Sequence, residues 1–347
     1  MNRVYDYDAV IVGASFAGLA TAMQLRGHRV LLLDQHPVGS HPMSACGTPL
    51  ATAQAVGAAT ATQEIHHALV LHTAGAAIRF DLRDPYITFD YSTFCRAMLA
   101  QTDAEFRQVR ATELHGNRVM TEQGAVSARF VVNAAGWRLQ ESQGVAASKM
   151  AGYGLETELP VRLPQMHGLQ FYFEKRIITN GYAWVFPCGD RVRIGIGSFT
   201  PGVKLRPRLE EFLNRFELRI GETHGGVLAI RKTEPLAAGV FCVGDAAGQC
   251  LPVTGEGIRT AIFHGIHCGQ AIANTLQGRF TPEEARALYH DQVHSMDRFH
   301  ARLLKLQTLA ARTPEFLLAW AGHICSSRPL TWRIMNKYLV DSGWFVP

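Results

Sequence analysis

The chain has 347 residues, of which 47% are hydrophobic and 18% are charged. This composition supplies enough apolar side chains for a large buried core, and it excludes disordered, collagen-like and low-complexity proteins. The formal net charge is only +5, which is too weak to indicate nucleic acid as the main partner. The length favours two domains.

Seven cysteines occur singly, at positions 46, 95, 188, 242, 250, 268 and 325. None has the CxxC spacing, so the sequence indicates neither a zinc knuckle nor a disulfide framework, and we expect a reducing, cytoplasmic environment. The pair His264 and His267 lacks a nearby carboxylate pattern, so we expect no metal. The first apolar run is too short for a signal peptide or a membrane span.

The N-terminal segment has the pattern of a βαβ unit. Residues 8–12 form an apolar run that ends at Gly13, residues 17–25 have helical spacing, and residues 30–33 form a second apolar run. The turn before the helix reads GASFAG, which is close to the GxGxxG pattern of dinucleotide sites. This unit predicts a nucleotide-binding domain.

Four residues of this unit have distinct roles in a dinucleotide site. Gly13 would form the tight turn, Ser15 would let the backbone approach a pyrophosphate, and Gly18 would allow close packing of helix on strand. Asp34 follows the second apolar run, where a carboxylate can hold ribose hydroxyls. The free N–H groups at the start of the helix would attract phosphate. The alternative is a glycine-rich turn that binds nothing.

A second strand and turn come much later in the chain. Residues 240–243 form an apolar run that leads into Gly244 and Asp245, and helical spacing covers residues 257–276. A carboxylate at the end of a strand can hold a polyol, and the start of the helix can face an anion. Together with the first unit, this pattern indicates one discontinuous domain.

The middle of the chain has strand patterns instead. Residues 169–174, 182–186 and 191–197 alternate or are rich in aromatic side chains, and turn signals separate them. These patterns predict an antiparallel sheet. Three aromatic residues of the second strand alternate with small ones, so they share one face, which is either a core face or a wall for an apolar ligand.

These motifs resemble those of FAD-dependent oxidoreductases of the geranylgeranyl reductase type, within the larger group of flavoproteins shaped like aromatic hydroxylases. The resemblance spans residues 8–280. Its most diagnostic segments are YAWVFP followed by GIG, Cys46-Gly47 ahead of a helical segment, and GDAAG followed by PVTGEGI. The chain departs from the family pattern at Glu256, which replaces a glycine, at residues 133–136, and at Tyr91 and Cys95, where an Arg and an Asp are usual.

The resemblance implies both the cofactor, FAD, and the site residues. Contacts to FAD are implied for Gly13, Ser15, Phe16, Ala17, Gly18, Asp34, Gln35, Ala45, Cys46, Gly47, Ala111, Gly244, Asp245, Gly255, Gly257 and Ile258. Tyr182, Trp184 and Phe186 would form the catalytic wall beside the flavin. Cys46 would donate a proton or shape the pocket, unless it is an ordinary buried cysteine.

The last segment of the chain is basic and rich in tryptophan. From Ala301 onward six basic residues stand against two acidic ones, and Trp320, Trp332 and Trp344 lie among them. This pattern predicts either peripheral membrane contact with anionic lipid headgroups or helices that cap the second domain with a solvated basic face.

We therefore predict an α/β (α+β) protein of two domains with C-terminal helices. The expected parts are a discontinuous, Rossmann-like FAD-binding domain (residues 1–75, 90–150 and 225–280), an antiparallel β-sheet substrate domain (residues 76–89 and 151–224) and a C-terminal helical segment (residues 281–347).

The predicted reaction is reduction of a carbon–carbon double bond in a prenyl-type, apolar, lipid-like substrate. The alternatives are a flavin-dependent monooxygenase that hydroxylates an aromatic substrate and a flavin electron carrier without turnover. No second GxGxxG indicates a nicotinamide domain, so either NAD(P)H or a ferredoxin-like protein can be the electron donor.

Overall fold

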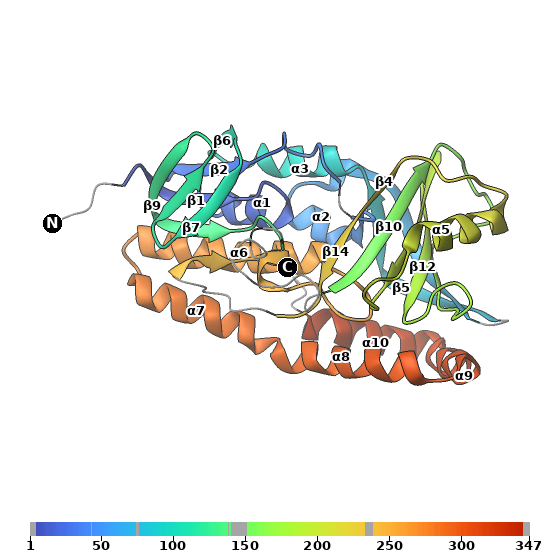
Figure 1. The fold of residues 1–347 in the computed structure, drawn as a ribbon. Coiled ribbons are helices and arrows are strands. Elements are labelled where there is room, and N and C mark those ends of the chain that lie inside the picture. Colours follow the sequence, from blue (N-terminus) through green and yellow to red (C-terminus); the bar gives the residue numbers. More distant parts are fainter. Residues whose placement is uncertain are drawn as a thin grey trace.

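The computed structural model describes residues 5–42, 44–73, 76–137, 139, 151–232 and 239–342. Two β-sheets lie at opposite ends of the molecule, and the helices of the C-terminal third run along one side of both (Figure 1). The predicted α/β class, with a Rossmann-like part, a second sheet and C-terminal helices, is confirmed.

The first sheet grows from the βαβ unit. Its strand order is β6, β2, β1, β9, β8 and β7, with β15 also on β9. The strands are β1 (Tyr7–Val12), β2 (Val30–Asp34), β6 (Glu105–Gln108), β7 (Ala111–His115), β8 (Arg118–Thr121), β9 (Gly124–Asn133) and β15 (Phe241–Cys242). β1, β2, β6, β9 and β15 pair in parallel. β1 and β2 are apolar throughout their centres because both faces of the sheet are covered.

Two helices from distant parts of the chain pack together under this sheet. They are α1 (Phe16–Met23) and α6 (Ile258–Leu276). A Cβ at Gly265 would lie 2.5 Å from the Ala17 carbonyl oxygen, and one at Gly269 would lie 2.6 Å from that of Thr21. These glycines, one helical turn apart, therefore allow the two backbones to touch. The N-termini of α1 and α6 consequently meet the same space.

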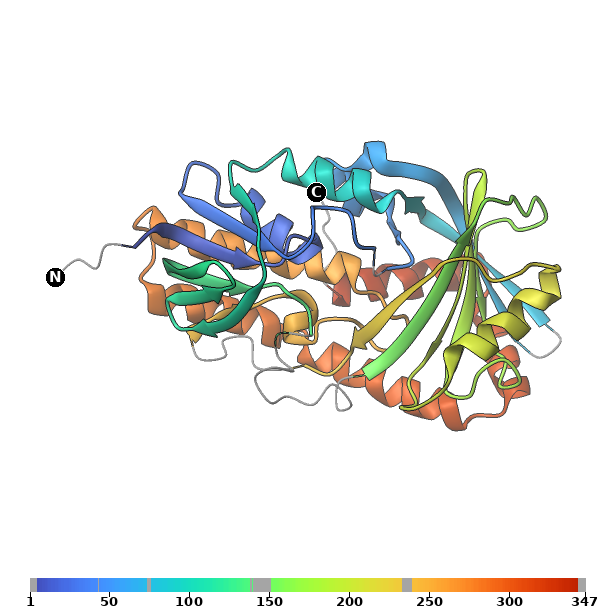
Figure 2. The same ribbon diagram turned by 45° about the horizontal axis from the view of Figure 1, so that its top comes forward.

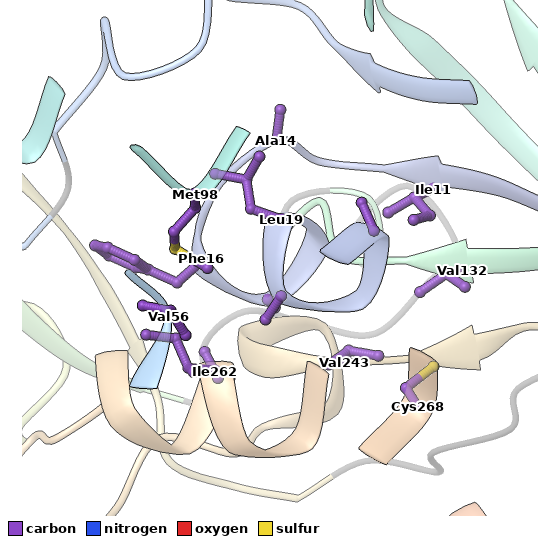
Figure 3. Close-up of a cluster of buried hydrophobic side chains, with 14 of the residues drawn as sticks. Ile11, Ala14, Phe16, Leu19, Val56, Met98, Val132, Val243, Ile262 and Cys268 are labelled. Atoms are coloured by element: carbon purple, nitrogen blue, oxygen red, sulfur yellow. The ribbon is translucent and has the colours of Figure 1, made fainter. Parts of the chain in front are cut away.

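The main core lies between this sheet and these helices (Figure 3). Ile11 and Val132 come from adjacent strands, Leu19 from α1, and Ile262 and Cys268 from α6. Two further helices, α2 (Leu50–Ala55) and α3 (Tyr91–Leu99), complete it, with a 3₁₀ turn at Ala59–Ala61. Burial of these apolar side chains fixes the position of the loop that follows β1.

The second sheet is large and mostly antiparallel. Its strand order is β14, β10, β13, β12, β11, β4, β5 and β3, and β11 pairs with β4 in parallel. The strands are β3 (Gly47–Pro49), β4 (Thr62–Thr73), β5 (Ala76–Phe89), β10 (Ala151–Leu159), β11 (Leu169–Tyr172), β12 (Gly181–Cys188), β13 (Arg191–Ser198) and β14 (Thr223–Ala229). Helix α5 (Leu205–Leu213) covers its outer face, which leaves the inner face toward the first domain.

Three strands lie in a different sheet from the one expected. We expected residues 1–75 and 225–280 in the nucleotide domain, but β3, β4 and β14 hydrogen-bond within the second sheet. Sequence periodicity can identify a strand but does not show which strand it pairs with. Here β3 and β4 pair with β5, and β14 pairs with β10, which places all three strands in the second sheet.

The C-terminal segment, which the structure describes as far as residue 342, contains four helices there. They are α7 (Pro282–Ser295), α8 (Asp297–Arg312), α9 (Glu315–Cys325) and α10 (Arg328–Asp341). The helical pattern of residues 282–309 is broken at Met296, where Lys232 Nζ donates to the Val293 carbonyl at 3.1 Å and pairs with Asp297 at 2.6 Å. The chain then returns along the second sheet, so that α9 packs on β4 and β5 (Figure 2). No helix in the described part of the chain is both long and apolar enough to cross a bilayer.

Candidate active site

A cavity of about 970 Å³ lies between the two sheets. Its walls come from the turn after β1, the end of β2, the loop before α6, the inner face of the second sheet and helix α10. Ligand pockets in proteins usually have volumes of about 300–1,000 Å³, so this cavity can hold a large ligand. All but two of the residues predicted for the site line it; the exceptions are Gly18 and Cys46.

At one end the cavity has the features of a nucleotide site. The Asp34 carboxylate accepts backbone N–H groups from Ala14 at 2.8 Å and from His36 at 2.9 Å. Each carboxylate oxygen retains a lone pair for a ribose hydroxyl. Gln35 and Ala111 also line this end.

The first turn of α1 offers an anion site at the same end. Ser15 occupies the N-cap position, but its hydroxyl makes no capping hydrogen bond. Instead it lies 3.0 Å from the Tyr91 hydroxyl. Ser15, which departs from the GxGxxG pattern, thus contacts Tyr91, which departs from the family pattern. The N–H groups of the first turn remain available to a phosphate.

Near the centre of the cavity, Asp245, Gly255, Gly257 and Ile258 line the wall together. Burial raises the pKa of Asp245 to about 6. Gly255 has φ +64°, and a Cβ there would lie 2.9 Å from the Tyr182 hydroxyl oxygen. A side chain at residue 255 would therefore clash with Tyr182, where this loop meets β12.

The second sheet supplies an aromatic wall. Tyr182, Trp184 and Phe186 alternate along β12, and all three line the cavity. Phe171 on β11 packs against Phe186, with ring centroids 5.3 Å apart. The Tyr182 hydroxyl donates to the Thr254 carbonyl at 2.7 Å, which fixes the wall to the loop before α6.

The two exceptions among the predicted residues lie behind the cavity wall. A Cβ at Gly18 would lie 1.8 Å from the Gly13 carbonyl oxygen, which is the close packing that the motif predicts. Cys46 belongs to the main core, and its thiol donates to the Ser44 carbonyl at 3.2 Å. Burial raises the pKa of this thiol. Ala45 and Gly47, on either side of it, do line the cavity.

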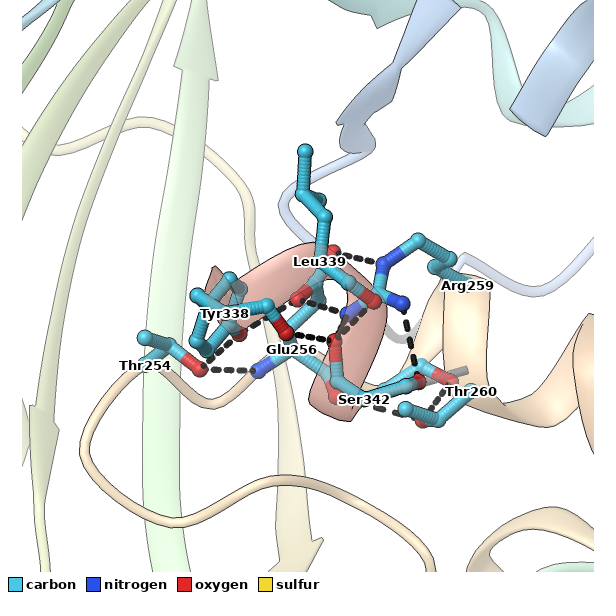
Figure 4. A network of polar contacts seen from close by, with 8 residues as sticks. Thr254, Glu256, Arg259, Thr260, Tyr338, Leu339 and Ser342 are labelled. Carbon is cyan, nitrogen blue, oxygen red and sulfur yellow. Dashed lines mark hydrogen bonds and ion pairs between the residues drawn. The ribbon is translucent and has the colours of Figure 1, made fainter. Parts of the chain in front are cut away.

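Glu256 connects the loop before α6 to the C-terminal helix α10 (Figure 4). Arg259 donates to both carboxylate oxygens of Glu256 at 2.8 Å, and the Tyr338 hydroxyl donates to one of them at 2.5 Å. Arg259 also donates to the carbonyl of Ser342 at 3.0 Å and to its hydroxyl at 2.7 Å. This network holds α10 over the cavity, which Ile334 and Met335 help to line.

The sequence motifs did not indicate two titratable residues of the cavity wall. Glu156 on β10 is 3% exposed, and its carboxylate lies 3.1 Å from Nε2 of His224 on β14. Both line the cavity. No local motif joins them, since the two residues are far apart in the sequence and become neighbours only through the pairing of β10 with β14.

Residues 8–318 match the family described as lycopene cyclase protein. The chain belongs to the lycopene cyclase protein family. A digeranylgeranylglycerophospholipid reductase from Methanosphaerula palustris is 27% identical over a match that covers 92% of this chain and 90% of that protein. Digeranylgeranylglycerophospholipid reductase 3 from Methanosphaera stadtmanae is 32% identical over 154 residues, and this match spans only 41% of this chain and 38% of the relative.

A solved structure has the same fold as this member of the lycopene cyclase protein family. It is a geranylgeranyl bacteriochlorophyll reductase-like protein from Thermoplasma acidophilum, with a TM-score of 0.82 and 19% identity over 97% of this chain and 96% of that one. The likeness to geranylgeranyl reductases that the motifs indicated is thus confirmed, as is the prediction of an enzyme.

Proposed function

We propose that this protein is an FAD-dependent oxidoreductase that reduces carbon–carbon double bonds in the prenyl chain of a lipid-like substrate. The main support for this proposal is that a single cavity joins the nucleotide-type turn to the aromatic wall. A nucleotide-type turn with Asp34 forms one end, and an aromatic wall with Trp184 forms another part. A ligand with a dinucleotide portion and a redox ring would place that ring beside the apolar wall.

The described residues fit FAD. The uncapped N-terminus of α1 would hold the pyrophosphate, Asp34 would hold the adenosine ribose, and Asp245 would hold the ribityl chain. The backbone at Gly255 and Gly257 would face the ring, where a larger side chain at Gly255 would meet Tyr182. When bound, FAD would supply the hydride equivalent for the reduction.

The remaining wall suits a long apolar chain. Leu69 and Leu71 on β4, Phe171 on β11 and Leu228 on β14 line it from the second sheet. Such a surface binds a prenyl chain by burial of apolar area and offers few polar groups to fix a small polar substrate. The names of the relatives, which are reductases of geranylgeranyl-bearing lipids, support the same substrate class.

The C-terminal helices would bring the cavity to its lipid. Phe316 and Trp320 on α9 are 69% and 67% exposed, and Leu309 on α8 is 63% exposed. The basic residues Arg312 and Arg328 flank α9. Apolar side chains beside cations are the pattern of an interfacial surface on an anionic membrane. Since α9 and α10 also contribute to the cavity wall, this surface adjoins the cavity.

The function can be tested with FAD-loaded protein reduced by dithionite without oxygen. A geranylgeranyl-bearing glycerolipid should reoxidise the flavin, and mass spectrometry should find two added hydrogens for each double bond lost. The matched lipid with saturated phytanyl chains should leave the flavin reduced. Oxygen uptake with hydroxylation of an aromatic compound would overturn the proposal in favour of a monooxygenase. Reoxidation by neither compound would leave an electron carrier.

A further inference from the structure

One row of side chains crosses four strands of the second sheet and faces the cavity. In this row His224 on β14 pairs with Glu156 on β10, Glu156 pairs with Gly195 on β13, and Gly195 pairs with Trp184 on β12. These four strands are direct neighbours in the second sheet (Figure 2). His224, Glu156 and Trp184 all line the cavity.

Glu156 is held from both sides of the row. The Trp184 indole Nε1–H donates to one carboxylate oxygen, and His224 Nε2 lies 3.1 Å from the other. The indole reaches across the intervening strand because residue 195 is glycine. A Cβ there would lie only 2.2 Å from the Trp184 ring. The GIG motif therefore seats the tryptophan, and the tryptophan orients the carboxylate.

The two side chains of this pair differ in their exposure to solvent. The Glu156 side chain is 3% exposed and that of His224 is 27% exposed. Burial of a carboxylate is costly unless the carboxylate is paired and hydrogen-bonded, and Glu156 has both kinds of partner. The imidazole, which is partly open to the cavity, can exchange protons with water.

Other charged and titratable groups around His224 have smaller effects. Glu156 raises the pKa of His224, burial acts against it, and a hydrogen bond to the Ser44 carbonyl adds to the increase. Arg193 on β13 opposes protonation, but its own charge is paired with Glu158 at 2.7 Å. The buried Cys46 thiol, whose pKa is raised, brings no charge at neutral pH. Glu156, which lies 3.1 Å from Nε2, therefore favours the protonated form of the His224 imidazole in the cavity wall.

We propose that His224, paired with Glu156 in the cavity wall, is the proton donor for the double-bond reduction. This inference rests on the proposed function. With reduced FAD bound, a hydride equivalent would add to one carbon of the double bond, and the electron pair of the broken π bond would take a proton from protonated His224 at the neighbouring carbon. The substrate would gain two electrons and two hydrogens, the two electrons would come from the bound cofactor, and neutral His224 would regain a proton from water. His224 is the catalytic residue; Glu156 and Trp184 position it.

The first test needs neither cofactor nor substrate. In FAD-free protein, the imidazole resonances of His224 should titrate by NMR above the ordinary histidine range. In Glu156→Gln, which keeps the size of the side chain and an acceptor for Trp184, the pKa should fall. A His224 resonance that titrates at or below the ordinary value in the wild-type protein, or one that does not change in Glu156→Gln, would overturn the proposal.

The second test follows reoxidation of the reduced flavin by the geranylgeranyl lipid in a single turnover. His224→Gln should slow it by roughly 10²–10⁴-fold, the range of general-acid effects, with unchanged FAD content. Glu156→Gln should move the alkaline limb of the pH profile to lower pH. The control is His72→Gln, since His72 lies on β4 of the same sheet, bonds Gln170 at 2.8 Å and does not line the cavity.

The outcomes separate the two proposals. If the wild-type protein reduces no double bond, the proposed function fails, while the NMR titration still measures the pair. If the wild-type protein reduces the lipid and His224→Gln does so at the same rate and with the same pH profile, the proton-donor assignment alone is wrong. Thermal melts identify a misfolded His224→Gln, in which case Glu156→Gln and its pH profile decide.

Discussion

Replacement of Arg259 by methionine should strongly destabilise the attachment of helix α10. The Arg259 side chain is fully buried and donates to Glu256 and Ser342. Burial disfavours the charged form of Glu256, but Arg259 outweighs this penalty and holds the pKa of that carboxyl below its usual range. Methionine fills a similar volume but leaves a buried carboxylate, which is 10% exposed, with the Tyr338 hydroxyl as a donor.

The magnitude follows from the burial of the pair. Removal of one partner from a buried ion pair costs about 3–5 kcal/mol, a large share of a total stability of about 5–15 kcal/mol. At about 2 °C per kcal/mol, the melting temperature should fall by roughly 6–10 °C. Because the network joins α10 to the loop before α6, hydrogen exchange should increase first in α10.

The matched control is the exposed pair Arg206 and Glu210 on α5, with side chains 58% and 47% exposed. Arg206→Met should cost less than about 1 kcal/mol. The double variant Glu256→Gln with Arg259→Met should be less destabilised than the sum of the two single variants, because no unpaired charge remains. If Arg259→Met costs no more than the control and exchange in α10 is unchanged, the Glu256–Arg259 pair does not anchor α10.

Three further predictions concern the cofactor, the cysteine and the membrane. In the folded protein, burial raises the pKa of Asp245 to about 6. The ionised carboxylate therefore destabilises FAD-free protein as the pH rises through 6. Asp245→Asn should consequently raise the melting temperature at pH 8 but not near pH 4. The same variant should retain less FAD; an unchanged FAD content would remove Asp245 from the site. Cys46→Ala should lower stability while FAD content and turnover persist, since the thiol faces the core; slowed turnover would support the proton-donor role predicted from sequence. Trp320→Ser should weaken salt-sensitive sedimentation with phosphatidylglycerol vesicles, unlike Ile65→Ser, a 49% exposed control on β4; equal loss in both would argue against a surface centred on α9.

Local patterns were sufficient to predict the elements that depend on nearby residues. Short-range preferences of the backbone and of side-chain burial explain three of these elements. They are the apolar runs at β1 and β2, the glycine turn between β1 and α1, and the alternation of Tyr182, Trp184 and Phe186. For the same reason Asp34 and Asp245 could be assigned to strand ends. Asp34 does end β2, whereas Asp245 lies in a 3₁₀ turn that follows β15, and both line the cavity. FAD contact at these positions stays a prediction.

The tertiary structure alone decided the relations between distant residues. The sequence of β4 does not show which sheet the strand joins, and it does not show that the thiol of Cys46, a residue with φ +52°, lies in the core. Glu156 and His224 looked like ordinary strand residues, yet β10 and β14 bring them together. Their ion pair is a property of strand pairing, which depends on long-range packing that a local sequence pattern does not encode.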